Sequence, residues 1–194
     1  MVVAVRDPSG ERGHAIAFLL DAYDGVPTPP GKGVPHAQAV ADVLRDAGYA
    51  LEVQVAALLH DVVEDTDRSV DDVHEQFGDR VADRVAQLTE DDRIREYARR
   101  KRALRQQLHA AGSPALDIAL ADKIATLRHA LLTDTRVRKR KLSHYRAVLD
   151  LGRDADIAHD LSNQVEELLS EAEARFSTSL SVEHGDDTHG PTLG

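Results

Sequence analysis

Apolar residues follow the spacing of an α-helix along most of this chain, and this spacing limits the folds open to it. Apolar side chains recur at intervals of three and four from residue 13 to residue 175. Beyond the first few residues, no run alternates as a half-buried strand does. We therefore predict an all-α fold of roughly eight to ten helices. The expected helices span roughly residues 13–23, 35–48, 51–65, 69–78, 80–88, 92–110, 114–132, 139–151 and 154–176.

Length and local composition predict one domain followed by a short tail. The chain has 194 residues, enough for a single core but too few for a second catalytic domain. We place the domain at residues 1–176, and we expect the polar, Gly/Ser/Thr-rich residues 177–194 to be a disordered tail. Residues 24–35 hold four of the seven prolines and are expected to form a loop between the first two helices.

The absence of cysteine bounds the chemistry and the compartment. With no cysteine, disulfide scaffolds, thiolate zinc sites and thiol nucleophiles are excluded, and reducing cytosol is favoured. The first residues lack the cationic start and apolar run of a signal peptide. No stretch approaches the roughly 18 apolar residues that a membrane span needs. We therefore expect a cytoplasmic protein that does not bind membranes.

Charge is distributed unevenly along the chain. The net charge is −10, yet residues 93–146 carry fifteen Lys and Arg against four acidic residues. These basic residues either form solvated helix faces or contact a polyanion. Only seven aromatic residues are present and none is Trp, which argues against a stacking platform for single-stranded nucleic acid.

Residues 56–66, AALLHDVVEDT, place polar side chains at the end of the most apolar helix expected. If this helix is continuous, its polar residues fall within an arc of about 140° on one side. These residues are His60, Asp61, Glu64 and Asp65. Carboxylates crowded in this way raise one another's pKa, so the arrangement is costly unless a cation or a phosphate-directed reaction explains it. The alternative is an exposed helix end with solvated acids.

Two further polar residues interrupt apolar helices. Asp122 lies within DIALADKIATL, and His36 begins the segment HAQAVADVL. Each has an ordinary alternative, since Asp122 can pair with an arginine of the basic segment and His36 can be a capping or surface residue. Combined with His60 and Asp61, they form a mixed nitrogen and oxygen ligand set suited to Mn²⁺ or Fe²⁺.

These residues carry a resemblance to a known family. The order His36, His60-Asp61, Glu64-Asp65 and Asp122 resembles the HD-domain metal-dependent phosphohydrolases. HDVVEDT resembles the hydrolase domain of the RelA/SpoT alarmone enzymes in particular. The resemblance covers roughly residues 31–145 and includes HAQAVADVLRDAG, SVDDVHEQFGDRVADRVAQLTED, ADKIATL and REYARRKRAL.

The resemblance implies a role for each matched residue. One Mn²⁺ ion, or Fe²⁺ or another divalent ion, would be held by His36, His60, Asp61 and Asp122. Glu64 and Asp65 would position and activate the attacking water. The substrate would be contacted by Lys32, Lys101, Thr126 and Lys141, the last two standing where the family usually has Asn and Arg.

The function implied is removal of the 3′-pyrophosphate from (p)ppGpp, as in the small alarmone hydrolases. The approach to the site departs from the family, because PPGKGVPHA lacks the paired basic residues, the Tyr and the Pro after His of the usual loop. One alternative is therefore an HD phosphohydrolase acting on another nucleotide or phosphate ester. Another is a non-catalytic module that binds nucleic acid through the basic run at residues 136–141. The sequence leaves the oligomeric state open.

Overall fold

The computed structural model describes residues 8–155 and 159–178, and every regular element in these ranges is a helix. The helices are α1 (Pro8–Ala22), α2 (Gly33–Asp46), α3 (Leu51–Leu59), α4 (Val62–Asp65), α5 (Val70–Phe77), α6 (Asp79–Leu88), α7 (Tyr97–Ala111), α8 (Ala115–Leu132), α9 (Lys139–Asp154) and α10 (His159–Thr178). The all-α prediction is confirmed. Within the described ranges, none of these helices combines the length and hydropathy needed to cross a bilayer.

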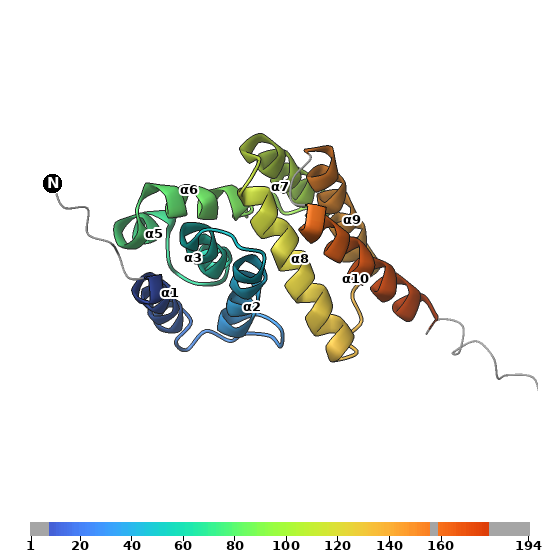
Figure 1. The fold of residues 1–194 in the computed structure, drawn as a ribbon, viewed down its shortest axis with the longest axis horizontal. Coiled ribbons are helices and arrows are strands. Elements are labelled where there is room, and N and C mark those ends of the chain that lie inside the picture. Colours follow the sequence, from blue (N-terminus) through green and yellow to red (C-terminus); the bar gives the residue numbers. More distant parts are fainter. Residues whose placement is uncertain (1–7, 156–158, 179–194) are drawn as a thin grey trace, which may run out of the picture.

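Helix α8 runs through the middle of the molecule (Figure 1). It packs against α2 on one side and against α9 and α10 on the other, while α7 contacts both α8 and α9. Leu116, Ile118 and Leu120 of α8 are fully buried in the larger core cluster, and Leu127 belongs to a second cluster with residues of α9 and α10. Asp122 and Lys123 of α8 are consequently held between packed helices, Asp122 against α2 and Lys123 against α9.

The predicted helix at residues 51–65 is interrupted, which corrects the assumption of one continuous helix. Helix α3 ends at Leu59, and α4 begins again at Val62. The His60 imidazole lies 2.7 Å from the carbonyl oxygen of Ala57, one of the last-turn carbonyls that a helix end leaves available. Because the chain turns at His60 and Asp61, the arc of about 140° calculated for a continuous helix does not apply.

Several other predicted boundaries move. Helix α7 begins at Tyr97 rather than at residue 92, because the Asp91 carboxylate accepts the backbone N–H of Arg93 and stabilises a turn. Helix α2 begins at Gly33, so the expected loop is shorter by three residues; Pro35 is tolerated there because a first-turn residue needs no N–H bond.

Two details concern the ends of α8 and α10. The Ser113 hydroxyl, just before α8, lies 2.5 Å from the Asp117 carboxylate and donates to it, and no side chain caps this helix. Helix α10 includes residues 177 and 178, so it extends two residues into the predicted tail. Residues 179–194 lie outside the described part of the chain, so the predicted disorder of the tail stays a prediction.

The helix predicted to begin at residue 69 starts with a capping box. The Ser69 hydroxyl accepts the N–H of Asp72, and the Asp72 carboxylate accepts the N–H of Ser69. We expect Ser69→Ala to lower the free energy of unfolding by about 1 kcal/mol, because it leaves first-turn N–H groups of α5 without this acceptor. Urea denaturation measures the loss. Ser170→Ala, on an exposed part of α10, is the control, and equal losses for both variants would contradict the prediction.

Candidate metal centre

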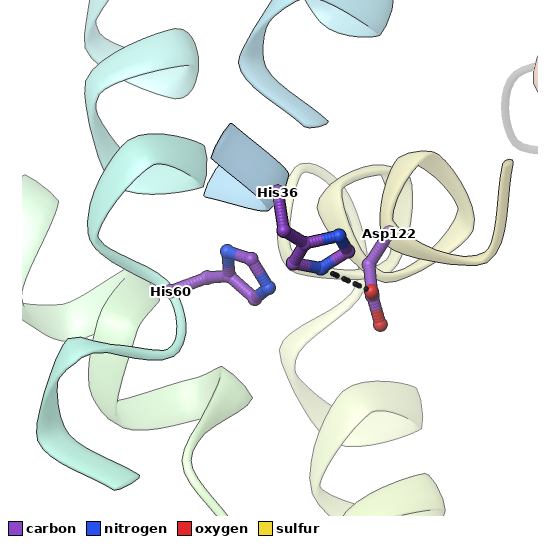
Figure 2. A group of neighbouring side chains, drawn as sticks. All are labelled: His36, His60 and Asp122. Atoms are coloured by element: carbon purple, nitrogen blue, oxygen red, sulfur yellow. Dashed lines mark hydrogen bonds and ion pairs between the residues drawn. The ribbon is translucent and has the colours of Figure 1, made fainter. Parts of the chain in front are cut away.

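Three predicted ligands from distant parts of the chain lie together in the structure. His36 lies in the first turn of α2, His60 follows α3, and Asp122 lies in the middle of α8. One ligand atom from each lies within 4.8 Å of the others. Figure 2 shows the His60 ring pointing toward His36, whose ring in turn meets the Asp122 carboxylate. Two imidazoles and one carboxylate in this arrangement fit a divalent cation.

The hydrogen bonding of His60 prepares it as a ligand. A carbonyl oxygen can only accept, so the contact with Ala57 requires the proton to be on Nδ1 of His60. This leaves a lone pair on Nε2. That nitrogen is buried and makes no hydrogen bond to the described residues, although Asp61 Oδ1 lies 3.2 Å away. A buried acceptor without a partner is costly in a purely structural role, but it is what a metal ligand provides.

Asp122, the third predicted ligand, is held in its ionised form. His36 Nε2 lies 3.0 Å from its Oδ1, Thr126 donates to the same oxygen, and Lys123 pairs with Oδ2. Burial opposes the charge, but Lys123 and His36 hold the pKa of Asp122 well below its usual value. The ionic partner of Asp122 is therefore a neighbouring lysine, not an arginine of the basic segment as the structural alternative assumed.

Lys123 combines burial with two contacts at the centre. Its side chain is almost fully buried, it pairs with Asp122, and its Nζ lies 5.2 Å from the centre of the Tyr145 ring. We expect Lys123→Met to destabilise the metal-free protein by about 3 kcal/mol, because it leaves the buried Asp122 carboxylate without its cation. Added Mn²⁺ should reduce this loss, since a bound cation would restore the missing charge.

Urea denaturation with chelator and with Mn²⁺ measures both effects. Lys139→Met, which removes an exposed lysine at the start of α9, is the matched control. A loss for Lys123→Met that Mn²⁺ leaves unchanged would contradict the assignment of Asp122 to the metal centre.

Asp61 lies beside the three-residue group rather than inside it. Its Oδ2 accepts from Lys32 Nζ at 2.9 Å, and its Oδ1 faces His60. Burial opposes the charge of Lys32, but Asp61 and Asp122 hold the pKa of that lysine above its usual value. A cation therefore already sits against Asp61, and its predicted role as a fourth ligand stays a prediction.

The break in the helix separates the two predicted catalytic carboxylates. Glu64 Oε1 accepts the backbone N–H of Glu90 at 2.7 Å and lines the cavity described below. Asp65 accepts from the Tyr23 hydroxyl at 3.1 Å at an exposed position, and it is absent from the cavity lining. Glu64 and Asp65 therefore do not crowd together as the continuous helix predicted, because each carboxylate has its own hydrogen-bond donor.

Glu64 has the electrostatics of a proton acceptor. Although part of its side chain reaches solvent, burial of the carboxylate, together with Asp61, raises the pKa of Glu64 to about 7. A carboxylate whose pKa lies near neutrality can hold and release a proton under ordinary conditions.

A cavity of about 590 Å³ opens beside the metal centre. Its volume is typical of sites that hold a nucleotide-sized ligand. Helices α7, α8 and α9 each present one face to it. These faces contain Tyr97, Lys101, Leu104 and Leu108 on α7, Ala119, Asp122, Lys123 and Thr126 on α8, and Lys141, His144, Tyr145 and Val148 on α9.

All four predicted substrate residues line this cavity: Lys32, Lys101, Thr126 and Lys141. Lys101 pairs with Glu90, and Lys32 pairs with Asp61. Burial and the nearby cations Lys32 and Lys101 lower the pKa of Lys141, so positive charge is concentrated here. The structure thus brings these residues together, while their contacts with a substrate remain predictions.

Sequence reasoning gave no role to Tyr97, Lys123, His144 or Tyr145, although each lines the cavity. A usable signal was present on α9, where Lys141, His144 and Tyr145 recur at helical spacing and share one face. The basic run at residues 136–141 overlaps the start of α9, so the segment was interpreted by its charge and not by the helical spacing of these three residues.

Comparison with known sequences gives a family and partial relatives. A model of the HD domain matches residues 15–151. The chain is 37% identical over 97 residues to guanosine-3′,5′-bis(diphosphate) 3′-pyrophosphohydrolase MESH1 of Mus musculus, and 46% identical over 76 residues to the Drosophila melanogaster protein of that name. These matches cover 49% and 39% of this chain and only 54% and 42% of the relatives' lengths.

Solved structures extend the likeness to most of the described helices. One, described as a metazoan ortholog of SpoT that hydrolyses ppGpp, superposes with a TM-score of 0.72 at 27% identity, covering 86% of this chain and 98% of its own. Another, from Listeria monocytogenes, superposes with a TM-score of 0.62 at 27% identity, covering 73% of this chain and 99% of its own. With a family match across residues 15–151 and two histidines and an aspartate gathered beside a cavity that His60 and Asp122 line, the chain belongs to the HD domain family.

Proposed function

We propose that the protein is a metal-dependent phosphohydrolase that removes the 3′-pyrophosphate from guanosine 3′,5′-bis(diphosphate). The observation that carries the proposal is the joining of the His36, His60 and Asp122 cluster to a cavity lined by Lys101, Lys123 and Lys141. Candidate metal ligands and lysines gathered around one cavity suit a substrate with several phosphate groups. Relatives named as 3′-pyrophosphohydrolases support the choice of substrate.

The metal would be held by His36, His60 and Asp122, with Asp61 as the proposed fourth ligand. A bound divalent ion lowers the pKa of a coordinated water and neutralises charge on a phosphoryl oxygen. Nitrogen and oxygen donors without sulfur favour Mn²⁺ or Fe²⁺, and we propose Mn²⁺.

Glu64 is proposed to take a proton from the attacking water. The backbone N–H of Glu90 fixes one of its oxygens at 2.7 Å, and a pKa of about 7 leaves a substantial ionised fraction at neutral pH. The water oxygen bonds to the phosphorus nearest the ribose as the bond from that phosphorus to the 3′ oxygen breaks, and the 3′ oxygen takes up a proton from solvent to become the hydroxyl of GDP. The products are GDP and pyrophosphate. Asp65 is proposed to help position the water, as the family resemblance implies.

The cavity walls would hold the substrate. Lys101 and Lys141 are proposed to contact phosphate oxygens, Lys32 to lie near the reacting end beside Asp61, and Thr126 to donate one hydrogen bond. Lysine in place of arginine at residue 141 keeps the charge but loses bidentate geometry.

A second candidate is hydrolysis of another nucleotide or phosphate ester at the same metal centre. The observation that favours it is the loop at residues 24–32, which places Lys32 at the cavity but lacks the paired basic residues and the Tyr of the resembling enzymes. Substrate choice depends on such contacts, whereas the metal centre does not.

A substrate panel separates the two candidates. Purified protein with Mn²⁺ is incubated with ppGpp, nucleoside monophosphates and nucleoside triphosphates, and chromatography and separate phosphate and pyrophosphate assays identify the products. The proposal expects GDP and pyrophosphate from ppGpp. Release of phosphate from monophosphates with no cleavage of ppGpp would establish the second candidate instead.

We further propose that residues 1–176 form the catalytic domain and that the protein acts in the cytoplasm without nucleic acid or membrane partners. The few aromatic residues and the net charge of −10 support the exclusion of nucleic acid. A gel shift at low salt that depends on Lys139 and Arg140, with no hydrolysis under any metal, would favour the binding module.

A further inference from the structure

His144 is a buried imidazole on the cavity wall to which the proposed reaction gives no role. It lies on α9, lines the cavity, and its side chain is only 4% exposed. Its Nε2 has no hydrogen-bond partner among the described residues. Two other cavity-lining residues also have buried polar atoms without a partner, the Tyr97 hydroxyl and His60 Nε2. Since His60 Nε2 faces the metal centre, the same property in His144 points to a ligand.

Arg105 determines which nitrogen of His144 carries the proton. A guanidinium N–H of Arg105 lies 3.0 Å from Nδ1 of His144. Arginine can only donate, so Nδ1 must be the acceptor and a neutral ring must carry its proton on Nε2. Arg105 therefore fixes His144 as a donor whose Nε2–H is buried and has no acceptor among the described residues.

Electrostatics keep this ring neutral and define what it can bind. Burial, followed by the charges of Lys123, Lys101 and Arg105, lowers the pKa of His144 to about 2. Burial and neighbouring lysines also lower the pKa of Lys141, one helical turn earlier on the same face. Cations that disfavour one another's charge in this way favour an anion between them, and a neutral N–H supplies a directed hydrogen bond without adding to the repulsion.

We propose that His144, held in one tautomer by Arg105, donates a hydrogen bond from Nε2 to a phosphate group of the ligand. His144 is then a specificity-determining residue of the cavity, and Arg105 is its positioning residue. A ligand with a hydrogen-bond donor at this place would meet another donor and be rejected. The inference rests on the proposed function in one respect: it assumes that the phosphate group bound by His144 belongs to a nucleotide.

The first test measures tautomer and binding without turnover. Metal is removed with a chelator, and long-range hydrogen–nitrogen correlation spectra of isotope-labelled protein are recorded with and without inorganic pyrophosphate; the spectrum of His144→Gln assigns the His144 signals. We expect a protonated Nε2 and an unprotonated Nδ1 across neutral pH, with the Nε2 signal shifting as pyrophosphate binds. A proton on Nδ1, or no shift on saturation, would overturn the proposal.

Three variants test the hydrogen bond itself. His144→Leu removes the donor and should weaken pyrophosphate binding about 10- to 100-fold, the effect of losing a hydrogen bond to a charged group. His144→Gln places an amide N–H near the position of Nε2 and should recover most of the affinity. His109→Gln, on the exposed side of α7, is the matched control and should bind as the unsubstituted protein does. Equal affinity of His144→Leu and the control would overturn the donor role.

Arg105→Met tests the positioning role. It removes the donor to Nδ1 and so should allow the second tautomer of His144, seen as a change in both ring nitrogen signals, with an intermediate loss of affinity. An unchanged tautomer and affinity would remove Arg105 from the proposal. Thermal unfolding shows whether each variant is folded. The tautomer itself is measured on the unsubstituted protein, and only the assignment of its signals requires a folded variant, His144→Gln.

The outcome separates this inference from the proposed hydrolysis. A protein that cleaves none of the substrates but binds pyrophosphate through His144 supports the inference and overturns the proposed function. An active hydrolase in which His144→Leu raises neither the dissociation constant for pyrophosphate nor the KM for ppGpp overturns the inference alone. If both hold, His144→Leu should raise KM with little change in kcat, because the hydrogen bond contributes equally to substrate and transition state.

Discussion

Replacing His60 with alanine is expected to strip the protein of its divalent ion and to lower turnover by about a thousandfold or more. His60 offers a buried Nε2 lone pair that no described residue uses, so no other side chain compensates for its loss. A metal ion contributes several kcal/mol to stabilising charge in phosphoryl transfer, and about 4 kcal/mol corresponds to a thousandfold in rate. Elemental analysis of the dialysed protein, measured together with turnover of ppGpp, tests both parts.

A surface histidine provides the matched control for His60→Ala. His74 lies on α5 and pairs with Asp79 at an exposed position, so His74→Ala should keep both metal and turnover. Circular dichroism confirms that the helices of each variant are retained. Full metal content in His60→Ala would remove His60 from the ligand set and contradict the assignment of the centre.

Asp61→Ala distinguishes a fourth ligand from a partner of Lys32. If Asp61 binds the ion, the variant should lose metal and turnover as His60→Ala does. If Asp61 only neutralises Lys32, the variant should retain its metal. The second outcome follows from the structure, in which Lys32 Nζ lies 2.9 Å from the Asp61 carboxylate and can account for its charge without a metal ion.

Glu64→Gln is expected to keep the metal and to lose about two to four orders of magnitude in kcat, the usual contribution of a positioned proton acceptor. Glutamine retains the carbonyl oxygen that can accept the N–H of Glu90, so the local structure should survive. It cannot take a proton from water. The measurement is kcat at saturating ppGpp, with metal content determined on the same samples.

Glu75→Gln, an exposed change on α5, controls for loss of one negative charge. It should leave kcat unchanged. A Glu64→Gln variant with full activity would show that another group accepts the proton, and Asp65 would then be the next residue to replace. Loss of metal from Glu64→Gln would instead make Glu64 a ligand.

Much of the fold could be predicted because helix formation is encoded in local spacing. The apolar stripes of α2 and α6, the almost continuous apolar run of α8 and the Ser69 cap are readable from residues a few positions apart, and the structure contains them. The break at His60 and Asp61 was not predicted, because no breaker residue marks it in the sequence. A glycine or proline would have marked it.

The candidate site divides in the same way. His36, His60 and Asp122 could be singled out because each is a polar residue on an apolar face, where burial without a purpose is costly. The hydrogen bond from the Tyr23 hydroxyl to the Asp65 carboxylate could not be predicted, because it depends on how the segment after α1 lies against α4. Lys123 follows Asp122 directly in the sequence, but its role as the buried cation that pairs with Asp122 is seen only from its burial against Tyr145.

Local spacing of residues is enough to predict that this chain forms helices and which polar side chains they carry into apolar surroundings, because both follow from the repeat of the helix. Which of these side chains meet depends on the three-dimensional packing of the helices. His36 and Asp122 are 86 positions apart, and Arg105 and His144 are 39 apart. Such pairs are set by the crossing of whole helices, which depends on how all their apolar faces pack together and not on any one segment.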